Sequence, residues 1–247
     1  MKLACASTTF DSQLASGDLT QLEWVDLCAR EVLADGIVCD VRHFPRLDTD
    51  YLAQIKKMAV DLGLTIAALW SEKLFDGDSD AIREVFATAD MLSAPLLCAP
   101  LPAETSGSWP DVLERLTLVA SVAKALNVTV ALRNRAGSFA AGDQDLKRVA
   151  KEADSAWVRF GPEFANLDAA SDATTLLSRT VIAWHVHRTG EIESDEANAV
   201  DRWLQRFQAF RGFLVLDVNG SPPVSAVRAA FEKWRTLAAT QTLSNAL

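Results

Sequence analysis

The chain is short of histidine, of tyrosine and of basic residues. Its 247 residues include three histidines and one tyrosine, and 33 acidic residues outnumber 24 basic ones, which gives a formal net charge of −9. Phosphate backbones bind to basic surfaces, so this balance argues against a nucleic-acid partner. Three histidines also leave little room for a multinuclear metal site built from imidazoles.

Several motifs are missing as well. No Gly-x-Gly-x-x-Gly follows a strand, and the chain has neither a P-loop nor a serine nucleophile elbow, which argues against the usual nucleotide-binding folds and against a serine hydrolase. No apolar run approaches the ~18 residues of a membrane helix. Residues 1–7 are too short and too soon polar for a signal peptide. We therefore expect a cytoplasmic protein with no membrane partner.

The four cysteines, Cys5, Cys28, Cys39 and Cys98, are widely spaced and form no Cys-x-x-Cys pair. Most lie in apolar segments, where a thiol behaves as a small hydrophobic group. The sequence predicts buried, unpaired cysteines in a reducing compartment.

Short apolar segments alternate with helical patterns along the chain. Segments typical of strands cover residues 3–7, 36–41, 64–69, 94–99, 128–135, 156–160, 181–186 and 212–217. Helical patterns cover residues 19–33, 48–62, 81–91, a long stretch ending near 127, and residues 143–153, 167–178, 195–210 and 224–240. Thr20 with Glu23 indicates a capping box, and Gly63 and Asn127 suit the position just after a helix.

This alternation predicts the fold class. Strands separated by helices pair in parallel through right-handed crossovers, and eight repeats close the sheet into a barrel. We predict an α/β protein, a (β/α)8 TIM barrel, with residues 1–247 as a single domain. An open doubly wound sheet is the alternative, but its usual nucleotide signature is absent.

In a TIM barrel the functional site forms at the carboxyl ends of the strands. The polar side chains expected there are Asp40, Arg42, His43, Glu72, Lys73, Arg133, Asn134, Arg135, Glu163, Asn166, His185, His187, Asp217 and Asn219. All three histidines belong to this set, which favours a functional role for that end of the barrel.

For the seventh predicted strand, the sequence shows which side chains share a face but not which face points into the barrel. His185 and His187 are two residues apart, so both point to the same side of the strand. If that side is the interior, both line the barrel mouth; otherwise one of them is a core histidine. Trp70 lies near a strand end, where its ring is available to stack on a ligand, whereas Trp184, of opposite parity to His185, is expected to pack under a helix.

Three segments carry a family resemblance: Arg42 to Pro45 with Asp50 to Lys57, Asp61 to Leu69, and Leu19 to Ala29. They resemble the sugar phosphate isomerase/epimerase family of xylose-isomerase-like TIM barrels. The resemblance is strong over roughly residues 1–100 and extends in outline to residue 220. It implies the same barrel fold and a small-molecule carbohydrate ligand, and it leaves a homo-oligomer open.

Members of that family typically hold a divalent metal with a Glu ending strand five, an Asp after strand six, a His on strand seven and a Glu ending strand eight. Two carboxylates then move a proton between neighbouring carbons of the sugar. By this resemblance Glu163, His187 and Asp217 take the last three places and are the expected metal ligands if a metal is retained. Arg133 stands in the first Glu place, and Arg135 replaces a residue that is often His.

The change at strand five bears on the metal. An arginine cannot ligate a cation and stays protonated at any working pH. At ~4 Å and an effective dielectric near 20, a cation and a guanidinium repel each other by about 4 kcal/mol per unit of ionic charge. We therefore expect either no cofactor or a weakly bound divalent metal (Mn, Mg or Zn).

Three interpretations of the site remain open. In the first, Arg133 replaces the metal and grips a substrate oxygen, with Glu163 or Asp217 as base and His187 as proton carrier. In the second, the barrel binds an anionic or polyol ligand without turnover. In the third, Arg133 swings outward to a salt bridge with Asp40, Glu72 or Glu163, and a weakened metal site persists. The candidate substrate-binding residues are Arg42, His43, Glu72, Asn134, Arg135, Asn166 and His185.

Overall fold

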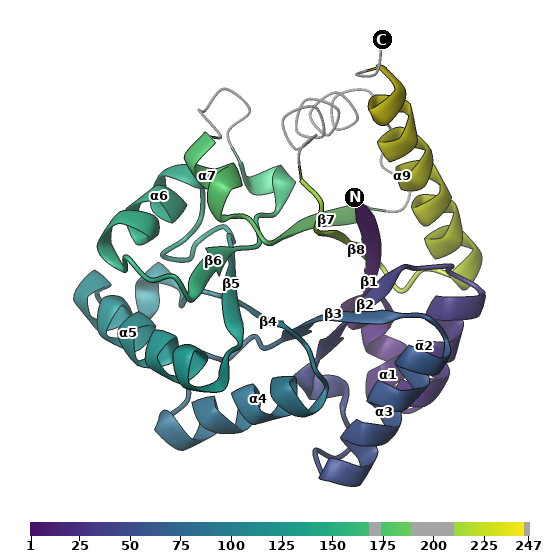
Figure 1. Cartoon of the computed structure of the whole chain (residues 1–247), viewed down its shortest axis with the longest axis horizontal. Coiled ribbons are helices and arrows are strands. Elements are labelled where there is room, and N and C mark those ends of the chain that lie inside the picture. Colours follow the sequence, from purple (N-terminus) through teal and green to yellow (C-terminus); the bar gives the residue numbers. More distant parts are fainter. Residues whose placement is uncertain (168–173, 189–209, 245–247) are drawn as a thin grey trace.

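A computed structural model describes residues 1–167, 174–188 and 210–244 of the chain. Eight strands pair in parallel in the order β6-β5-β4-β3-β2-β1-β8-β7, and helices cover the outside of the curled sheet (Figure 1). The strands are β1 (Lys2–Ala6), β2 (Gly36–Asp40), β3 (Thr65–Trp70), β4 (Leu96–Pro100), β5 (Thr129–Arg133), β6 (Val158–Phe160), β7 (Ile182–Arg188) and β8 (Phe213–Asn219). The predicted TIM barrel is confirmed.

Helices and single turns connect the strands. The α-helices are α1 (Asp11–Ser16), α2 (Gln21–Arg30), α3 (Thr49–Asp61), α4 (Ser79–Met91), α5 (Trp109–Leu126), α6 (Asp143–Glu152), α7 (Thr174–Arg179) and α9 (Val224–Ser244). The 3₁₀ turns are η1 (Ser7–Phe10), η2 (Val41–His43), η3 (Glu104–Ser106) and η4 (Phe164–Asn166). Apart from Phe210, which is not helical, the predicted helix 195–210 lies outside the described residues.

The helix boundaries follow local chemistry. The Thr20 hydroxyl accepts a hydrogen bond from the Glu23 amide at 3.3 Å, and the Glu23 carboxylate accepts one from the Thr20 amide at 2.8 Å. This confirms the predicted capping box, which satisfies N–H groups that have no partner inside the helix. At the other end, Gly63 and Asn127 adopt φ of 75° and 55°, the left-handed conformation that follows a helix. The α1 helix and the 3₁₀ turns are too short for a periodic signal.

The barrel closes between β6 and β7 without a regular ladder. Isolated bridges join Phe160 to Thr180 and Glu163 to Trp184, and the Trp184 amide donates to the Pro162 carbonyl at 2.8 Å. A Cβ on Gly161 would lie 2.9 Å from a methyl of Ile182. Glycine at position 161 therefore allows β7 to approach, and this approach brings Glu163 to the barrel mouth.

Two apolar cores lie on the two faces of the sheet. The outer core packs the strands against the helices, and it includes Leu216 and Val218 of β8. The inner core contains no helix residue and consists of small side chains such as Ala4 and Ala131 together with Trp70 and Trp184. The expectation that Trp184 packs under a helix is therefore wrong, since this side chain points into the barrel.

Two further expectations concern the whole chain. All four cysteines are buried and unpaired, as predicted. In the part of the chain that the structure describes, no helix is long and apolar enough to cross a bilayer.

Candidate active site

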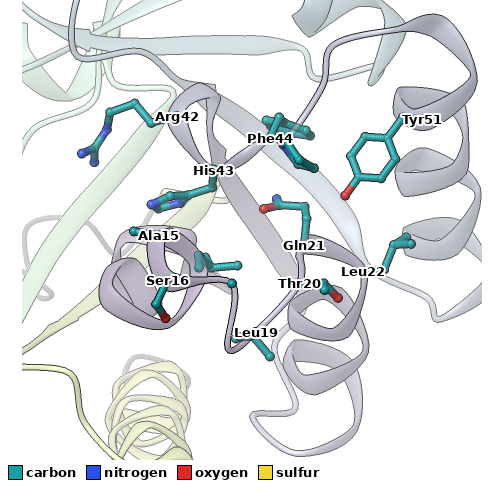
Figure 2. A pocket seen from close by; sticks show the side chains of 13 residues that line it. Ala15, Ser16, Leu19, Thr20, Gln21, Leu22, Arg42, His43, Phe44 and Tyr51 are labelled. Atoms are coloured by element: carbon teal, nitrogen blue, oxygen red, sulfur yellow. The ribbon is translucent and has the colours of Figure 1, made fainter.

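Two hollows open at the carboxyl ends of the strands. A cavity of about 590 Å³ lies beside α1, η2 and the start of α2, and it is bordered by Arg42 and His43 (Figure 2). A smaller, more polar hollow of about 330 Å³ lies between the ends of β1 and β8 and includes Thr8, Asp11 and Ser221. Arg42 borders both hollows.

Arg133 is the charged residue at the centre of the barrel mouth. It ends β5 with the same parity as Ala131, which belongs to the inner core, so its side chain points inward. Its Nη2 and Nε donate to Glu163 Oε2 at 2.5 and 3.0 Å, and its Nη1 lies 3.9 Å from Asp217 Oδ2. Only 14% of its side chain is exposed. The outward swing of the third interpretation is not observed, although the pairing with Glu163 is.

Two tryptophans form a floor beneath the guanidinium. The Arg133 Cζ atom lies 4.4 Å from the Trp184 ring centroid and 5.3 Å from that of Trp70. The two rings are 5.2 Å apart and tilted by 60°. Stacking on aromatic faces fixes a guanidinium in place and shields it from water. The Trp70 ring, which was predicted to stack on a ligand, thus contacts the guanidinium of Arg133.

Asp217 faces Arg133 from β8. It shares the parity of Val215, an inner-core residue, and is 7% exposed. Burial raises the pKa of its carboxyl group, against the opposing effects of the Arg133 charge and the Thr8 hydroxyl. Its Oδ1 atom is buried without a hydrogen-bond partner among the described residues. A buried carboxylate with a raised pKa and an oxygen to spare has the properties of a general base.

Glu163 is held by the neighbouring loop. Its backbone amide donates to Asn134 Oδ1 at 2.6 Å, and Asn134 Nδ2 donates to the carbonyls of Glu163 and Ala141, each at 3.4 Å. Asn166 Nδ2 donates to the Asn134 carbonyl at 3.3 Å. Asn134 is fully buried. Asn134 thus uses its side chain to hold the Glu163 backbone, and the contact of Asn166 is likewise with the protein itself. Substrate contacts of the two residues stay a prediction.

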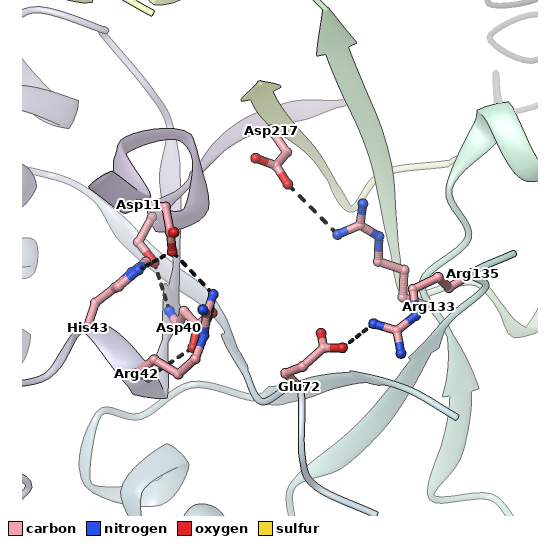
Figure 3. Close-up of polar contacts among 9 residues, drawn as sticks. Asp11, Asp40, Arg42, His43, Glu72, Arg133, Arg135 and Asp217 are labelled. Atoms are coloured by element: carbon pink, nitrogen blue, oxygen red, sulfur yellow. Dashed lines mark hydrogen bonds and ion pairs between the residues drawn. The ribbon is translucent and has the colours of Figure 1, made fainter. Parts of the chain in front are cut away.

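A second arginine cluster surrounds the end of β2 (Figure 3). Arg42 donates to the buried Asp40 carboxylate from Nε and Nη2 at 3.0 and 2.7 Å, and its Nη2 lies 3.3 Å from Asp11. His43 bonds to Ser7 Oγ through Nδ1 and to Asp11 through Nε2, both at 2.8 Å. Because the Asp11 carboxylate only accepts, Nε2 carries a proton. Both ring nitrogens are thus engaged within the protein.

Glu72 and Arg135 form a third pair, joining the loops after β3 and β5 at the rim of the mouth (Figure 3). Their side chains are 36% and 45% exposed. Both side chains are therefore open to solvent at the rim, and their role in substrate binding stays a prediction.

The two histidines of β7 lie on the opposite face from Trp184. His185 pairs in register with Leu216 of the outer core, and its ring lies 4.6 Å from Trp234 of α9. Burial above all, and then the neighbouring His187 and Lys233, lower the His185 pKa to about 4. His187 shares this strand face, with its ring 6.1 Å from that of His185. Of the two alternatives for these histidines, the structure therefore supports the second: β7 presents its other parity to the interior, and His185 is a buried core histidine.

Sequence reasoning missed the residues that follow β1. Ser7 bonds to His43 and to the Asp40 amide, Thr9 accepts from the Val218 amide at 3.0 Å, and Asp11 contacts both Arg42 and His43. The rule that identified the other strand ends applies equally to the first strand. The signal is a polar segment, residues 8–12, that directly follows the first predicted strand.

The residues of the mouth do not fit a divalent metal. Glu163 and Asp217, the two carboxylates expected to ligate one, flank the guanidinium of Arg133, and His187 lies on the other face of β7 from Trp184. Within residues 1–167, 174–188 and 210–244, no three His, Cys, Asp or Glu side chains are grouped so as to hold an ion. A metal at this point would face a fixed positive charge.

Comparisons with known proteins identify the fold. No protein-family profile and no curated protein sequence matches the chain. Among solved structures, it is similar to the probable 3-DHS dehydratase AsbF from Bacillus anthracis, with 13% identity, 94% of this chain and 98% of that chain covered, and a TM-score of 0.76. D-psicose 3-epimerase from Clostridium cellulolyticum H10, solved with D-tagatose, gives 14% identity, 96% and 99% coverage, and a TM-score of 0.75.

A third similar structure is the IOLI protein with a bound zinc atom, with 15% identity, 99% and 97% coverage, and a TM-score of 0.67. Other similar structures are described as xylose isomerase domain proteins or as a xylose isomerase-like TIM barrel. At these identities the likeness shows the fold, which is the one that the sequence resemblance implied.

Proposed function

We propose that this xylose-isomerase-like barrel transfers a proton next to the carbonyl group of a sugar, with Arg133 in the place of a metal ion. The observation that carries the proposal is the guanidinium held between Glu163 and Asp217 above two tryptophan rings. Structural relatives include an epimerase solved with D-tagatose and a 3-keto-D-glucoside 4-epimerase. Those activities belong to the relatives and support a carbohydrate substrate for this chain.

Arg133 acts as the electrophile. A guanidinium has five N–H donors, and Nε and Nη2 each use one of theirs on Glu163. The Nη1 atom is 3.9 Å from Asp217, too far for a hydrogen bond, so a substrate oxygen can accept from it. Donors fixed where negative charge develops stabilise an enediolate, and they act most strongly in a site that excludes water.

Asp217 acts as the base. Its carboxylate takes the proton from the carbon beside the carbonyl, and the C–H electron pair forms the C=C bond of the enediolate while the carbonyl oxygen gains charge beside Arg133. Return of the proton to the former carbonyl carbon, together with transfer of the enediolate hydroxyl proton to the charged oxygen beside Arg133, completes an isomerisation. The raised pKa of Asp217 suits this exchange, because a base with a pKa nearer the working pH both takes and returns a proton. Glu163 holds Arg133 in position. No role is left for His187 as proton carrier in this scheme.

The polar hollow beside β8 suits the rest of a sugar. Thr8, Thr9, Ser12 and Ser221 bring hydroxyl groups to it, and Asp11 and Arg42 add charged groups. Mixed donors and acceptors of this kind match a chain of alcohol groups.

Solvent exchange tests the proposal. Chelator-treated protein is incubated in D2O with D-tagatose, D-fructose or D-xylulose, and NMR follows the loss of the C–H signal beside the carbonyl. We expect exchange without added metal, and its loss in Arg133→Met and Asp217→Asn but not in Glu84→Gln, a change on an exposed face of α4. Exchange that requires Mn²⁺ would exclude Arg133 as the replacement.

A binding module without turnover is the second candidate. It is favoured by the closed pairing of Arg133 with Glu163, which a purely structural charge would also adopt. Saturable binding of a ketose without deuterium incorporation would select this alternative.

A further inference from the structure

The cavity of about 590 Å³ beside α1 and η2 is separate from the groups assigned to proton transfer. None of Arg133, Glu163 and Asp217 borders it. Its walls are largely apolar, and Figure 2 shows them converging from several elements. They include Leu14, Leu19, Leu22, Phe44, Pro45 and Tyr51. Its size is typical of a pocket for a small ligand.

Gln21 is the unexplained residue of this cavity. It lines the wall at the start of α2 and is 2% exposed, and neither its Oε1 nor its Nε2 has a hydrogen-bond partner among the described residues. Its amide opposes the effect of burial on the Cys39 pKa, so that thiol is a polar neighbour, but a thiol is a weak partner. A buried amide without hydrogen bonds destabilises a fold. Figure 2 shows the amide amid the lining side chains.

The charged neighbours of the cavity are already engaged. Arg42 pairs with Asp40 and Asp11, and both ring nitrogens of His43 are bonded to Ser7 and Asp11. An anion held by Arg42 would compete with these carboxylates and, because 53% of that side chain is exposed, with water. The ring faces of Phe44 and Tyr51 instead favour a flat, uncharged molecule.

We propose that this cavity, the Gln21 pocket, binds a small, neutral, planar molecule that carries a carboxamide or lactam group, recognised by the Gln21 amide. One amide presents a donor and an acceptor side by side, and a second amide complements both. Both amide atoms of Gln21 are buried in this structure, so a ligand is met only when the side chain changes rotamer; the outer torsion is broad, and it then orients the amide plane to match the ligand.

Two matched probes test the proposal. Benzamide carries a planar carboxamide, and acetophenone replaces its NH2 with a methyl group at nearly constant shape. NMR titration of the full chain is expected to give about tenfold tighter binding of benzamide, because the site loses a hydrogen bond with acetophenone. In Gln21→Met this preference disappears, and in Gln54→Met, the same change on an exposed face of α3, it stays.

Stability provides an independent readout. Gln21→Met is expected to raise the Tm of the free protein, since it removes a buried amide without partners while keeping the side-chain volume. A lower Tm would show that the amide is bonded within the fold and would overturn the proposal. So would the absence of benzamide binding at millimolar concentration, equal binding of the two probes, or a preference that survives Gln21→Met.

Discussion

At the barrel mouth, Arg42 and Arg133 are each paired with two carboxylates, and the two arginines differ in which partner is buried. On the β2 side, Asp40 is fully buried while 53% of the Arg42 side chain is exposed. On the β5 side, the Arg133 side chain is 14% exposed and the side chains of Glu163 and Asp217 10% each. Arg42 therefore compensates a buried acid, whereas Arg133 is itself the buried charge.

This difference in burial also determines the surroundings of the N–H groups that each arginine does not use on a carboxylate. Arg42 directs its Nε, its Nη2 and its backbone amide to Asp40, which ties η2 to the end of β2. Arg133 bonds to a single oxygen of Glu163 and keeps Nη1 beyond hydrogen-bond distance of Asp217. Among the described residues both guanidiniums leave Nη1 without a hydrogen bond, but the Arg42 side chain is 53% exposed and the Arg133 side chain only 14%. A ligand at Arg133 therefore meets a donor that is largely shielded from water, whereas at Arg42 water competes for it.

Removing each arginine gives the largest predicted contrast. Arg133→Met leaves two buried carboxylates without a cation, which is expected to lower the free energy of unfolding by about 3–5 kcal/mol and to slow solvent exchange by about 10²- to 10³-fold. Arg42→Met, with its cation half exposed, is expected to lose less stability and little exchange. Urea unfolding and deuterium incorporation measure the two effects. Equal losses of exchange in the two variants would remove the distinction.

His185, a buried basic group with no acidic partner in the described part of the chain, sharpens the comparison. His185 has a pKa lowered to about 4, so the fold favours its neutral form. Its stabilising contribution is complete above the unfolded pKa near 6.5 and is lost as the pH falls toward 4, by about 3 kcal/mol in all. His185→Leu is expected to flatten the unfolding free energy over this range. If the unfolding free energy depends on pH as steeply in the variant as in the native chain, the pH dependence comes from other groups.

Asn134, whose side chain holds the backbone of Glu163, is expected to have an intermediate effect on stability and on exchange. Asn134→Ala leaves the Glu163 amide buried without its acceptor, at an expected cost of about 1–3 kcal/mol. Because Glu163 then holds Arg133 less firmly, solvent exchange should slow as well. Asn166→Ala removes one 3.3 Å bond at a half-buried side chain and serves as the milder control. A larger loss in the control would reassign the positioning role.

The exposed pair of Glu72 and Arg135 should have the smallest effect. Pairs of this kind contribute about 0–1 kcal/mol because water and salt screen them. Arg135→Gln is therefore expected to change the unfolding free energy by less than about 1 kcal/mol. An effect as large as that of Arg133→Met would show that burial does not determine how much these ion pairs contribute to stability.

The fold could be predicted from the sequence because alternation of strands and helices leaves few topologies. The strand ends could be predicted too, since Arg133, Glu163 and Asp217 each follow an apolar run. The sequence could not show which face of β7 points into the barrel. A parallel strand covered on both sides is apolar at every position, so one residue of shift exchanges Trp184 for His185 without changing the pattern.

Pairings within the mouth depended on contacts that no local pattern encodes. Arg133 contacts Glu163, 30 residues away, because Gly161 lets β7 approach and Asn134 holds the Glu163 amide. Likewise, Gln21 reads as an ordinary first-turn residue of α2, and its lack of partners becomes visible only when the surrounding elements are in place.

Calorimetric titration with MnCl2, run side by side on the native chain and on Arg133→Glu, is the sharpest test of whether the guanidinium has taken the place of a metal. We expect no saturable heat from the native chain. In the variant, where a third carboxylate faces Glu163 and Asp217, we expect stoichiometric binding and a matching rise in Tm, about 2.7 kcal/mol of stabilisation at a metal concentration 100 times the Kd. Stoichiometric binding of Mn²⁺ by the native chain, lost in Glu163→Gln, would contradict the replacement.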